Sequence, residues 1–132
     1  MNKTSLARLL AVQSTFPLLY GGKFWMEDEI LKQELEVFGI STRDKKFELS
    51  LIEVWKSNYE DADTFILSNL NKKIPLDPVL RLLLQYAYVE FTHIKTKRSI
   101  VISEYKKLAL LFGDKEYEKF VQGILNKLEQ EK

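Results

Sequence analysis

The side chains used most often in catalysis and metal binding are scarce in this chain. Its 132 residues include no cysteine and a single histidine, His93. Zinc sites are usually built from several cysteine or histidine ligands, so the composition excludes thiolate chemistry and disfavours a zinc centre. His93 stands in a polar stretch between Thr92 and Lys95, and we expect it at the surface.

Two acidic clusters are the remaining candidates for catalytic or metal-binding carboxylates: Glu27-Asp28-Glu29 and Glu60-Asp61-Ala62-Asp63. Paired carboxylates can act as general acid and base, or bind magnesium. Acidic residues also favour the start of a helix for electrostatic reasons, which explains both clusters more simply. The chain has no glycine-rich phosphate loop. We therefore expect a binding protein and not an enzyme, with no catalytic residue and no metal site.

The elements that would position functional side chains are helices. Apolar spacing predicts an all-α chain of about seven helices, beginning near residues 4, 24, 41, 60, 78, 99 and 115. Pro17 should kink or end the first helix, and Gly21-Gly22 should close it. We expect Ser41 and Asp44 to start the third helix, and a break or bend near Ser57-Asn58 to separate it from the fourth.

The last three helices have clearer boundaries. Asp77 is a predicted N-cap with Pro78 at the first helical position, and the apolar helix that follows should be central in the fold. Gly113 should end the sixth helix, and Asp114 should cap the seventh. Short connections between helices of this length favour a compact bundle.

Length and composition predict one globular domain over residues 1–132, because 45% of the residues are apolar and 30% are charged. The N-terminus is a poor signal peptide, and the longest apolar run, residues 79–91, is too short to span a bilayer. We expect a cytoplasmic protein. The net charge of +1 gives no overall argument for nucleic-acid binding, but basic side chains gather in residues 1–22 and 93–107 and could form a local positive face.

One stretch is more specific than composition. Residues 100–128 read IVISEYKKLALLFGDKEYEKFVQGILNKL. They resemble the C-terminal signature of the NusB family of bacterial transcription antitermination factors, roughly V-x-I-N-E-x-x-x-L-A-x-x-F-G followed by K-F-V-N-G-[VI]-L-D-K. Residues 7–13, ARLLAVQ, are similar to the family's opening A-R-x-x-A-[VL]-Q, and residues 79–82, VLRL, to its central L-R-[LI] helix.

This resemblance implies an all-α fold of two small helical bundles packed together. It also implies binding of boxA-type single-stranded RNA as a heterodimer with NusE, a small-subunit ribosomal protein. The complex would help RNA polymerase read through terminators in ribosomal RNA operons, with no metal or organic cofactor. The partner face would lie on the middle helices, roughly residues 59–90, and self-association as a homodimer stays open.

The family's RNA face uses a basic N-terminal segment, the start of the first helix and the start of the last helix. Carried over by position, the resemblance implies an RNA-binding role for Lys3, Arg8, Gln13, Phe16, Glu116, Phe120 and Gln122. By chemistry we add Lys95, Lys97 and Arg98 as phosphate contacts. Gly123 is harder to explain as a core or capping residue, because a glycine inside a helix costs about 1 kcal/mol relative to alanine. It indicates close approach of another helix or of a ligand to the backbone.

The chain also departs from the family pattern. The arginine-rich run that often opens the family is reduced to one basic side chain, Lys3, within residues 2–6, and Gln122, Asn126 and Ser103 replace the signature Asn, Asp and Asn. Fewer phosphate contacts predict weaker binding and a shallower salt dependence. Two alternatives therefore stay open. One is a NusB-fold protein-interaction module with little RNA binding, and the other is an RNA-recognition module that assists a ribosomal RNA methyltransferase.

Overall fold

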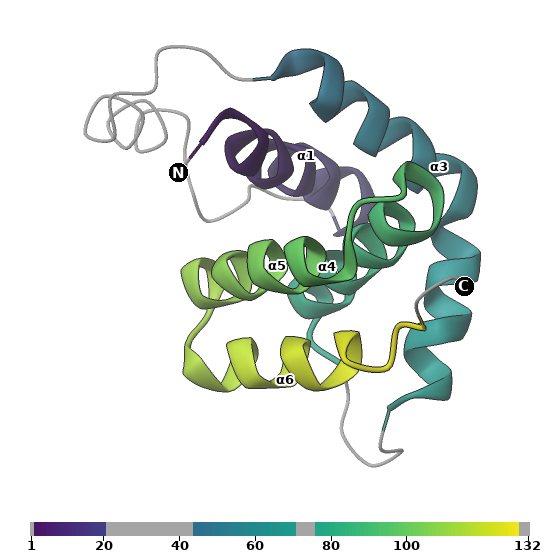
Figure 1. Cartoon of the computed structure of the whole chain (residues 1–132), viewed down its shortest axis with the longest axis vertical. Coiled ribbons are helices and arrows are strands. Elements are labelled where there is room, and N and C mark those ends of the chain that lie inside the picture. The colour runs from purple at the N-terminus through teal and green to yellow at the C-terminus, as the bar shows by residue number, and fades with distance from the viewer. Residues whose placement is uncertain (1, 21–43, 71–75, 130–132) are drawn as a thin grey trace. The chain divides into compact units, whose positions relative to one another are not determined.

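Every regular element that the structure describes is helical. The structure is a computed structural model, and it describes residues 2–20, 44–70 and 76–129. Within these ranges there is no strand, and the elements in chain order are α1 (Lys3–Tyr20), α3 (Lys45–Ser68), α4 (Pro78–Val89), a π-helical turn η1 (Glu90–Ile94), α5 (Arg98–Phe112) and α6 (Lys115–Leu125) (Figure 1). The predicted all-α class is confirmed. The predicted helix at 24–38, the Gly21-Gly22 stop and Ser41 lie outside the described residues.

The predicted number of about seven helices is not matched, because the third and fourth predicted helices are one element. α3 runs without interruption through Ser57 and Asn58. The Asn58 side-chain amide donates to the carbonyl of Val54, one turn back, so this polar residue bonds within the helix instead of ending it. Trp55 and Ile66, on either side of the expected break, are both buried. Their burial outweighs the weak helix propensities of serine and asparagine.

The first helix, α1, begins at a cap provided by Asn2 and continues through Pro17. The side chain of Asn2 accepts a hydrogen bond from the backbone N–H of Ser5 and caps the helix start. α1 then continues through Pro17 to Tyr20. Pro17 therefore does not end the helix, although it cannot donate to the carbonyl one turn earlier.

Contacts within the chain fall into two compact units, residues 1–52 and 53–132. The first contains α1 and the start of α3. Asp44 begins α3 by accepting a hydrogen bond from the N–H of Phe47. Buried apolar side chains of this unit come from both helices: Leu6, Ala7, Leu9, Leu10, Ala11, Val12 and Leu51.

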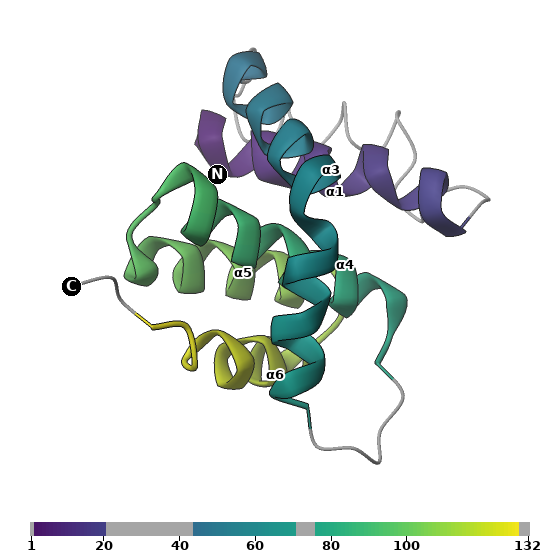
Figure 2. The ribbon, with the colours of Figure 1, turned by 90° about the vertical axis from the view of Figure 1, so that its right-hand side faces the viewer.

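The second unit is organised around α4. Asp77 accepts hydrogen bonds from the N–H groups of Val79 and Leu80, and Pro78 occupies the first helical position, as predicted. Nearly all of α4 is buried, which confirms its central place: Leu80, Leu82, Leu83, Leu84, Gln85, Tyr86, Ala87 and Val89. α5 and α6 lie side by side and both contact α4 (Figure 1). Residues 53–68 of α3 run across α4 (Figure 2).

The π-helical turn η1 continues α4 and changes the direction of the chain before α5. Its first residue, Glu90, is fully buried and accepts a hydrogen bond from the hydroxyl of Tyr105 on α5. The turn ends at Lys95, whose φ of 68° and ψ of 29° are left-handed.

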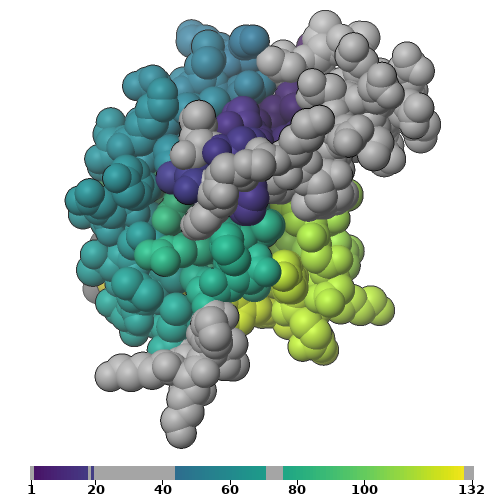
Figure 3. Space-filling view, turned by 180° about the vertical axis from the view of Figure 1, so that it is seen from behind, coloured from purple at the N-terminus to yellow at the C-terminus, as the bar shows by residue number. Residues whose placement is uncertain are grey.

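Atoms of α4, α5 and α6 meet in one continuous surface of this unit (Figure 3). No described helix is both long and apolar enough to cross a bilayer.

Candidate nucleic-acid interface

The start of α6 is fixed by the turn that joins it to α5. Asp114 caps the helix, since its side chain accepts from the N–H groups of Glu116 and Tyr117. Gly113 ends α5, as predicted, and its missing side chain is required by packing. A Cβ atom at this position would lie 2.2 Å from the Tyr117 ring. The glycine therefore lets the Tyr117 ring lie against the turn.

This position brings the Tyr117 hydroxyl to the start of α4. The hydroxyl donates a hydrogen bond of 2.7 Å to Oδ2 of Asp77, whose Oδ1 caps α4. The hydrogen bond to Asp77, together with burial and the negative charges of Asp77 and Asp114, raises the pKa of Tyr117 above its ordinary value. The first turns of α4 and α6 are thereby joined through a single carboxylate.

α6 buries one side and exposes the other. Val121, Ile124 and Leu125 are buried. Of the predicted RNA-binding residues, Glu116 is exposed and Phe120 is half-buried, and they lie one turn apart on the same side. Gln122 is exposed too, but it lies about 160° around the helix from Phe120 at 3.6 residues per turn. The structure therefore brings Glu116 and Phe120 together and places Gln122 apart from them.

Gly123 lies on the exposed side of α6, next to Phe120. A Cβ atom added there would meet no other atom within 4 Å. Among the described residues, no neighbouring helix approaches Gly123.

Residues 95–98 connect η1 with α5, and their three basic side chains differ in exposure and in the contacts that they make. Lys95 and Lys97 are exposed, whereas Arg98 is half-buried. The Arg98 Nε atom donates to the Leu128 carbonyl at 2.9 Å, and a second guanidinium nitrogen donates to the Asn126 carbonyl. These carbonyls follow α6, so Arg98 ties the end of α6 to the start of α5 and satisfies carbonyl groups that the helix leaves open.

The predicted residues of α1 belong to the first unit and are less exposed than the sequence indicated. Lys3 is exposed, Gln13 and Phe16 are half-buried, and Arg8 is only 4% exposed. The Arg8 guanidinium carbon lies 5.0 Å from the centre of the Phe47 ring, a cation–π contact between α1 and the start of α3. In α1, Lys3 is the one cationic side chain at the surface.

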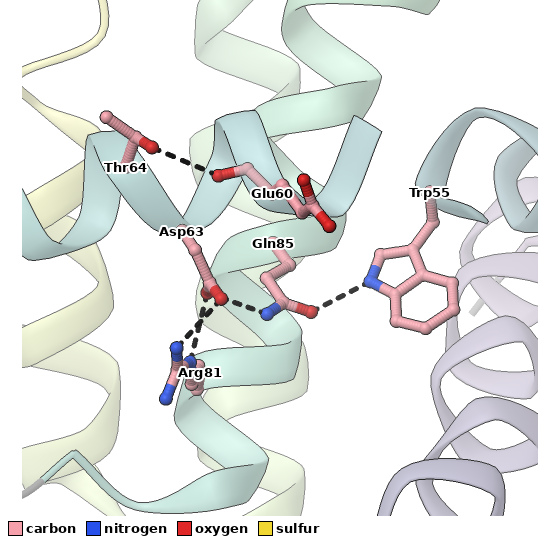
Figure 4. A network of polar contacts seen from close by, with 6 residues as sticks. All are labelled: Trp55, Glu60, Asp63, Thr64, Arg81 and Gln85. Atoms are coloured by element: carbon pink, nitrogen blue, oxygen red, sulfur yellow. Dashed lines mark hydrogen bonds and ion pairs between the residues drawn. The ribbon is translucent and has the colours of Figure 1, made fainter. Parts of the chain in front are cut away.

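A polar network that the sequence did not reveal crosses from α3 to α4 (Figure 4). The Trp55 indole N–H donates to Gln85 Oε1 at 2.8 Å, and the Gln85 amide donates to Asp63 at 2.8 Å. Arg81 donates to both carboxylate oxygens of Asp63, at 3.0 and 2.8 Å. Only the interruption of an apolar run by Gln85 hinted at a buried polar partner.

Opposing influences set the pKa of Asp63. Burial is the largest single influence and raises the pKa. The hydrogen bonds from Arg81 and Gln85 and the charge of Arg81 together outweigh burial, and the pKa falls below its ordinary value of 3.8. Asp63 is therefore an ion-pair partner of Arg81, and its carboxylate is committed to that role.

The acidic clusters do not form a metal site in the part of the chain that can be described. Glu60 and Asp61 are exposed, and Asp63 is bound to Arg81. No group of three or more potential ligands gathers within residues 2–20, 44–70 and 76–129. The other cluster, Glu27-Asp28-Glu29, lies outside these ranges.

Comparison with known families supplies the context for these residues. The model of the NusB family matches residues 5–130, which is nearly the whole chain. The chain belongs to the NusB family. No match was found among curated proteins. In this NusB-family chain the C-terminal signature corresponds to α5, the Gly113-Asp114 turn and α6, and the VLRL motif to the first turns of α4. Arg81 of that motif makes the Asp63 ion pair.

Proposed function

We propose that this NusB-family protein is a transcription antitermination factor. It binds boxA-type RNA together with NusE and promotes read-through of ribosomal RNA operons by RNA polymerase. Family membership supports the general assignment. The observation that carries RNA binding is Gly123, a signature glycine on the exposed side of α6, where no described atom would lie within 4 Å of an added side chain.

The surroundings of Gly123 suit a single RNA strand. Gly123 is the third residue from the C-terminal end of α6. A glycine in a helix is less favourable than alanine and exposes more backbone. Phe120, three residues earlier, offers an aromatic ring on which a base can stack, and Lys119 and Lys127 lie exposed one turn away on either side. Aromatic and cationic groups on one surface are typical of proteins that bind single-stranded RNA.

We also propose that NusE binds the middle helices, within residues 59–90. Tyr59 supports this assignment. It is 37% exposed, and its ring stacks on Trp55 at 5.2 Å, which in turn stacks on Tyr86 at 5.7 Å. An exposed tyrosine held by stacking loses little side-chain entropy on binding, and tyrosine is enriched at interface hot spots. In this proposal the protein acts in the cytoplasm by binding alone, without catalysis or a cofactor.

The second candidate, a protein-interaction module with little RNA binding, is favoured by one observation. Arg8, which the family resemblance places on the RNA face, is buried with its guanidinium over Phe47. The basic contribution of α1 is then reduced to Lys3. A protein with this surface could keep its NusE contact while having weak affinity for RNA.

Fluorescence anisotropy of a labelled boxA-like RNA distinguishes the two candidates. The RNA is titrated with the protein alone and with NusE, at two salt concentrations, using wild type and Gly123→Ala. Antitermination predicts salt-sensitive binding that strengthens with NusE. It also predicts a weaker Gly123→Ala complex, although this variant should be more stable by about 0.5–1 kcal/mol. A folded protein that binds NusE but no RNA would support the protein-interaction module instead.

A further inference from the structure

The solvent-exposed side of α5 is rich in aliphatic side chains. Three of the exposed residues of this helix are large and apolar: Ile100 is 43% exposed, Leu110 45% and Leu111 41%. Exposed apolar residues that gather on one side of an element, instead of being scattered singly, mark an interaction surface. We refer to the exposed side chains of this helix as the α5 face, which consists of Ser99, Ile100, Ser103, Lys107, Leu110 and Leu111.

The apolar pair near the end of α5 is a feature of this chain. The part of the NusB signature that α5 carries reads L-A-x-x-F-G, and Leu110 and Leu111 occupy the two positions that the signature leaves open. The α5 face therefore has a character that belongs to this protein and is not prescribed by the family pattern.

Four residues of the α5 face have the spacing of a seam between packed helices. They follow one another at steps of three, four and three residues: Ile100, Ser103, Lys107 and Leu110. At 100° per residue these positions lie within an arc of about 80°. Alternating steps of three and four are the spacing at which two helices pack side by side in coiled coils. The α5 face can therefore receive another helix along its length.

The seam reads the same in both directions, which makes it suited to a second copy of this chain. A two-fold dimer needs a self-complementary surface. If two α5 helices pack antiparallel about Tyr105, Ile100 of one copy lies opposite Leu110 of the other.

The charges of the seam also favour the antiparallel arrangement. Lys107 would lie opposite the small, neutral Ser103 of the other copy, whereas parallel helices would place the two Lys107 side chains together and repel. Within its own chain Lys107 has the carboxylate of Glu104 at 3.7 Å, so its charge is balanced beside the seam.

We propose that two copies of this protein associate through antiparallel packing of their α5 helices. The family resemblance left self-association open, and the α5 face gives it a specific surface. One helix face is smaller than the roughly 800 Å² that a standard interface buries on each partner, so the dimer is weak and reversible. It uses neither the exposed side of α6 nor residues 59–90, to which the proposed function assigns RNA and NusE.

Sedimentation equilibrium of the full chain between roughly 10 µM and 1 mM tests this inference. The average mass of the wild type should rise from 15.5 kDa towards twice that value. Ile100→Lys/Leu110→Lys places lysine opposite lysine and should stay monomeric throughout. The matched control, Leu49→Lys/Leu67→Lys, makes the same replacements at two α3 leucines that are 52% and 58% exposed, and it should dimerise as the wild type does. Circular dichroism would verify that both variants are folded.

Disulfide cross-linking tests the orientation of the two helices. The chain contains no cysteine, so introduced thiols cross-link without background. An equimolar mixture of Ile100→Cys and Leu110→Cys proteins is oxidised by dissolved oxygen with copper–phenanthroline as catalyst. Either variant alone should cross-link at least about tenfold more slowly than the mixture, because identical positions would lie about 15 Å apart in the antiparallel dimer.

Four results would overturn the inference. A wild type that stays monomeric at the highest concentration has no such dimer. Equal dimerisation of the wild type and Ile100→Lys/Leu110→Lys would place the contact elsewhere. Cross-linking of either cysteine variant alone that is as fast as in the mixture would exclude the antiparallel arrangement. A monomeric wild type whose NusE binding is lost in Ile100→Lys/Leu110→Lys would assign the α5 face to NusE.

Discussion

At the scale of single residues, Asp63 is one of four side chains that connect α3 with α4, and it accepts hydrogen bonds from Arg81 and Gln85. We expect Asp63→Asn to lower the free energy of unfolding by about 1–2 kcal/mol at pH 7, because it removes the charge paired with partly exposed Arg81. Urea unfolding would measure the loss. Asp61→Asn, which neutralises an exposed carboxylate two residues away, is the control and should change stability little. Equal losses in the two variants would contradict a special role for Asp63.

The same residue predicts how stability depends on pH. The pKa of Asp63 is lowered in the folded protein, so as pH falls the unfolded chain takes up this proton before the folded one does. The stability contributed by its carboxylate is fully present above about pH 4 and is lost as pH falls through the lower, folded pKa. The difference in unfolding free energy between wild type and Asp63→Asn should therefore shrink on acidification.

A substitution of Arg98 can separate its structural hydrogen bonds from its positive charge. Lysine at this position keeps the charge but cannot reproduce two directed hydrogen bonds to the Asn126 and Leu128 carbonyls. Arg98→Lys should therefore lower stability by about 1–2 kcal/mol while leaving the salt dependence of RNA binding near that of the wild type. Thermal unfolding and RNA titration together check this. A variant as stable as the wild type would contradict this structural role of Arg98.

The sequence predicted which positions could contact RNA, but it did not predict which partner each side chain has in the folded protein. Arg8 and Arg98 both looked like surface cations. The first is buried against Phe47 and the second caps the end of α6. Both arrangements depend on partners far away in the sequence, 39 and about 30 positions on, and no local pattern encodes such pairs. Asp63 and Gln85 were missed for the same reason.

At the scale of elements, the turn between α5 and α6 links two helix starts through Gly113, Tyr117 and Asp77. Gly113→Ala would force the Tyr117 ring to move and should cost about 1–3 kcal/mol. Tyr117→Phe, which only removes the hydrogen bond to Asp77, should cost about 1 kcal/mol.

A double-mutant cycle measured by chemical unfolding would test this linkage. In a Tyr117→Ala background the ring is absent, so Gly113→Ala should cost much less than in the wild type. Additive effects would mean that the glycine is needed for some reason other than the ring.

Element boundaries were predictable where capping chemistry is local. Asp77-Pro78 and Gly113-Asp114 end or begin helices as their sequences indicate. Of the break or bend expected near Ser57-Asn58, the break is wrong, because α3 is continuous and the propensity of a few polar residues is small beside the burial of Trp55, Ala62 and Ile66. The π-helical turn at 90–94 was not predicted. Its first residue, Glu90, is hydrogen-bonded to Tyr105 of another helix, a contact that no local pattern encodes.

At the scale of the whole molecule, charge is balanced and basic groups act locally. With a net charge of +1, long-range attraction of RNA should be weak. We therefore expect the association rate constant to vary little between 50 and 200 mM salt, and the dissociation rate to carry most of the salt effect. Stopped-flow fluorescence would measure both rates. An association rate that falls steeply with salt would indicate a larger positive field than the chain's composition provides.

The division of the chain into two units could not have been located from the sequence. It falls between residues 52 and 53, inside α3. Domain boundaries are usually sought at glycine, proline or polar linkers, and a continuous helix offers none of these signals. Family resemblance implied two helical bundles, but only the contacts place the division.

The network around Trp55 also gives the protein a built-in optical probe. The chain has two tryptophans, at positions 25 and 55. In a Trp25→Phe variant the remaining indole would be 5% exposed, stacked with two tyrosines and hydrogen-bonded to Gln85. Its emission maximum should lie at short wavelength and move to longer wavelength when α3 separates from α4. One fluorophore would then report, in real time and without labelling, whether a bound partner loosens or tightens that helix pair.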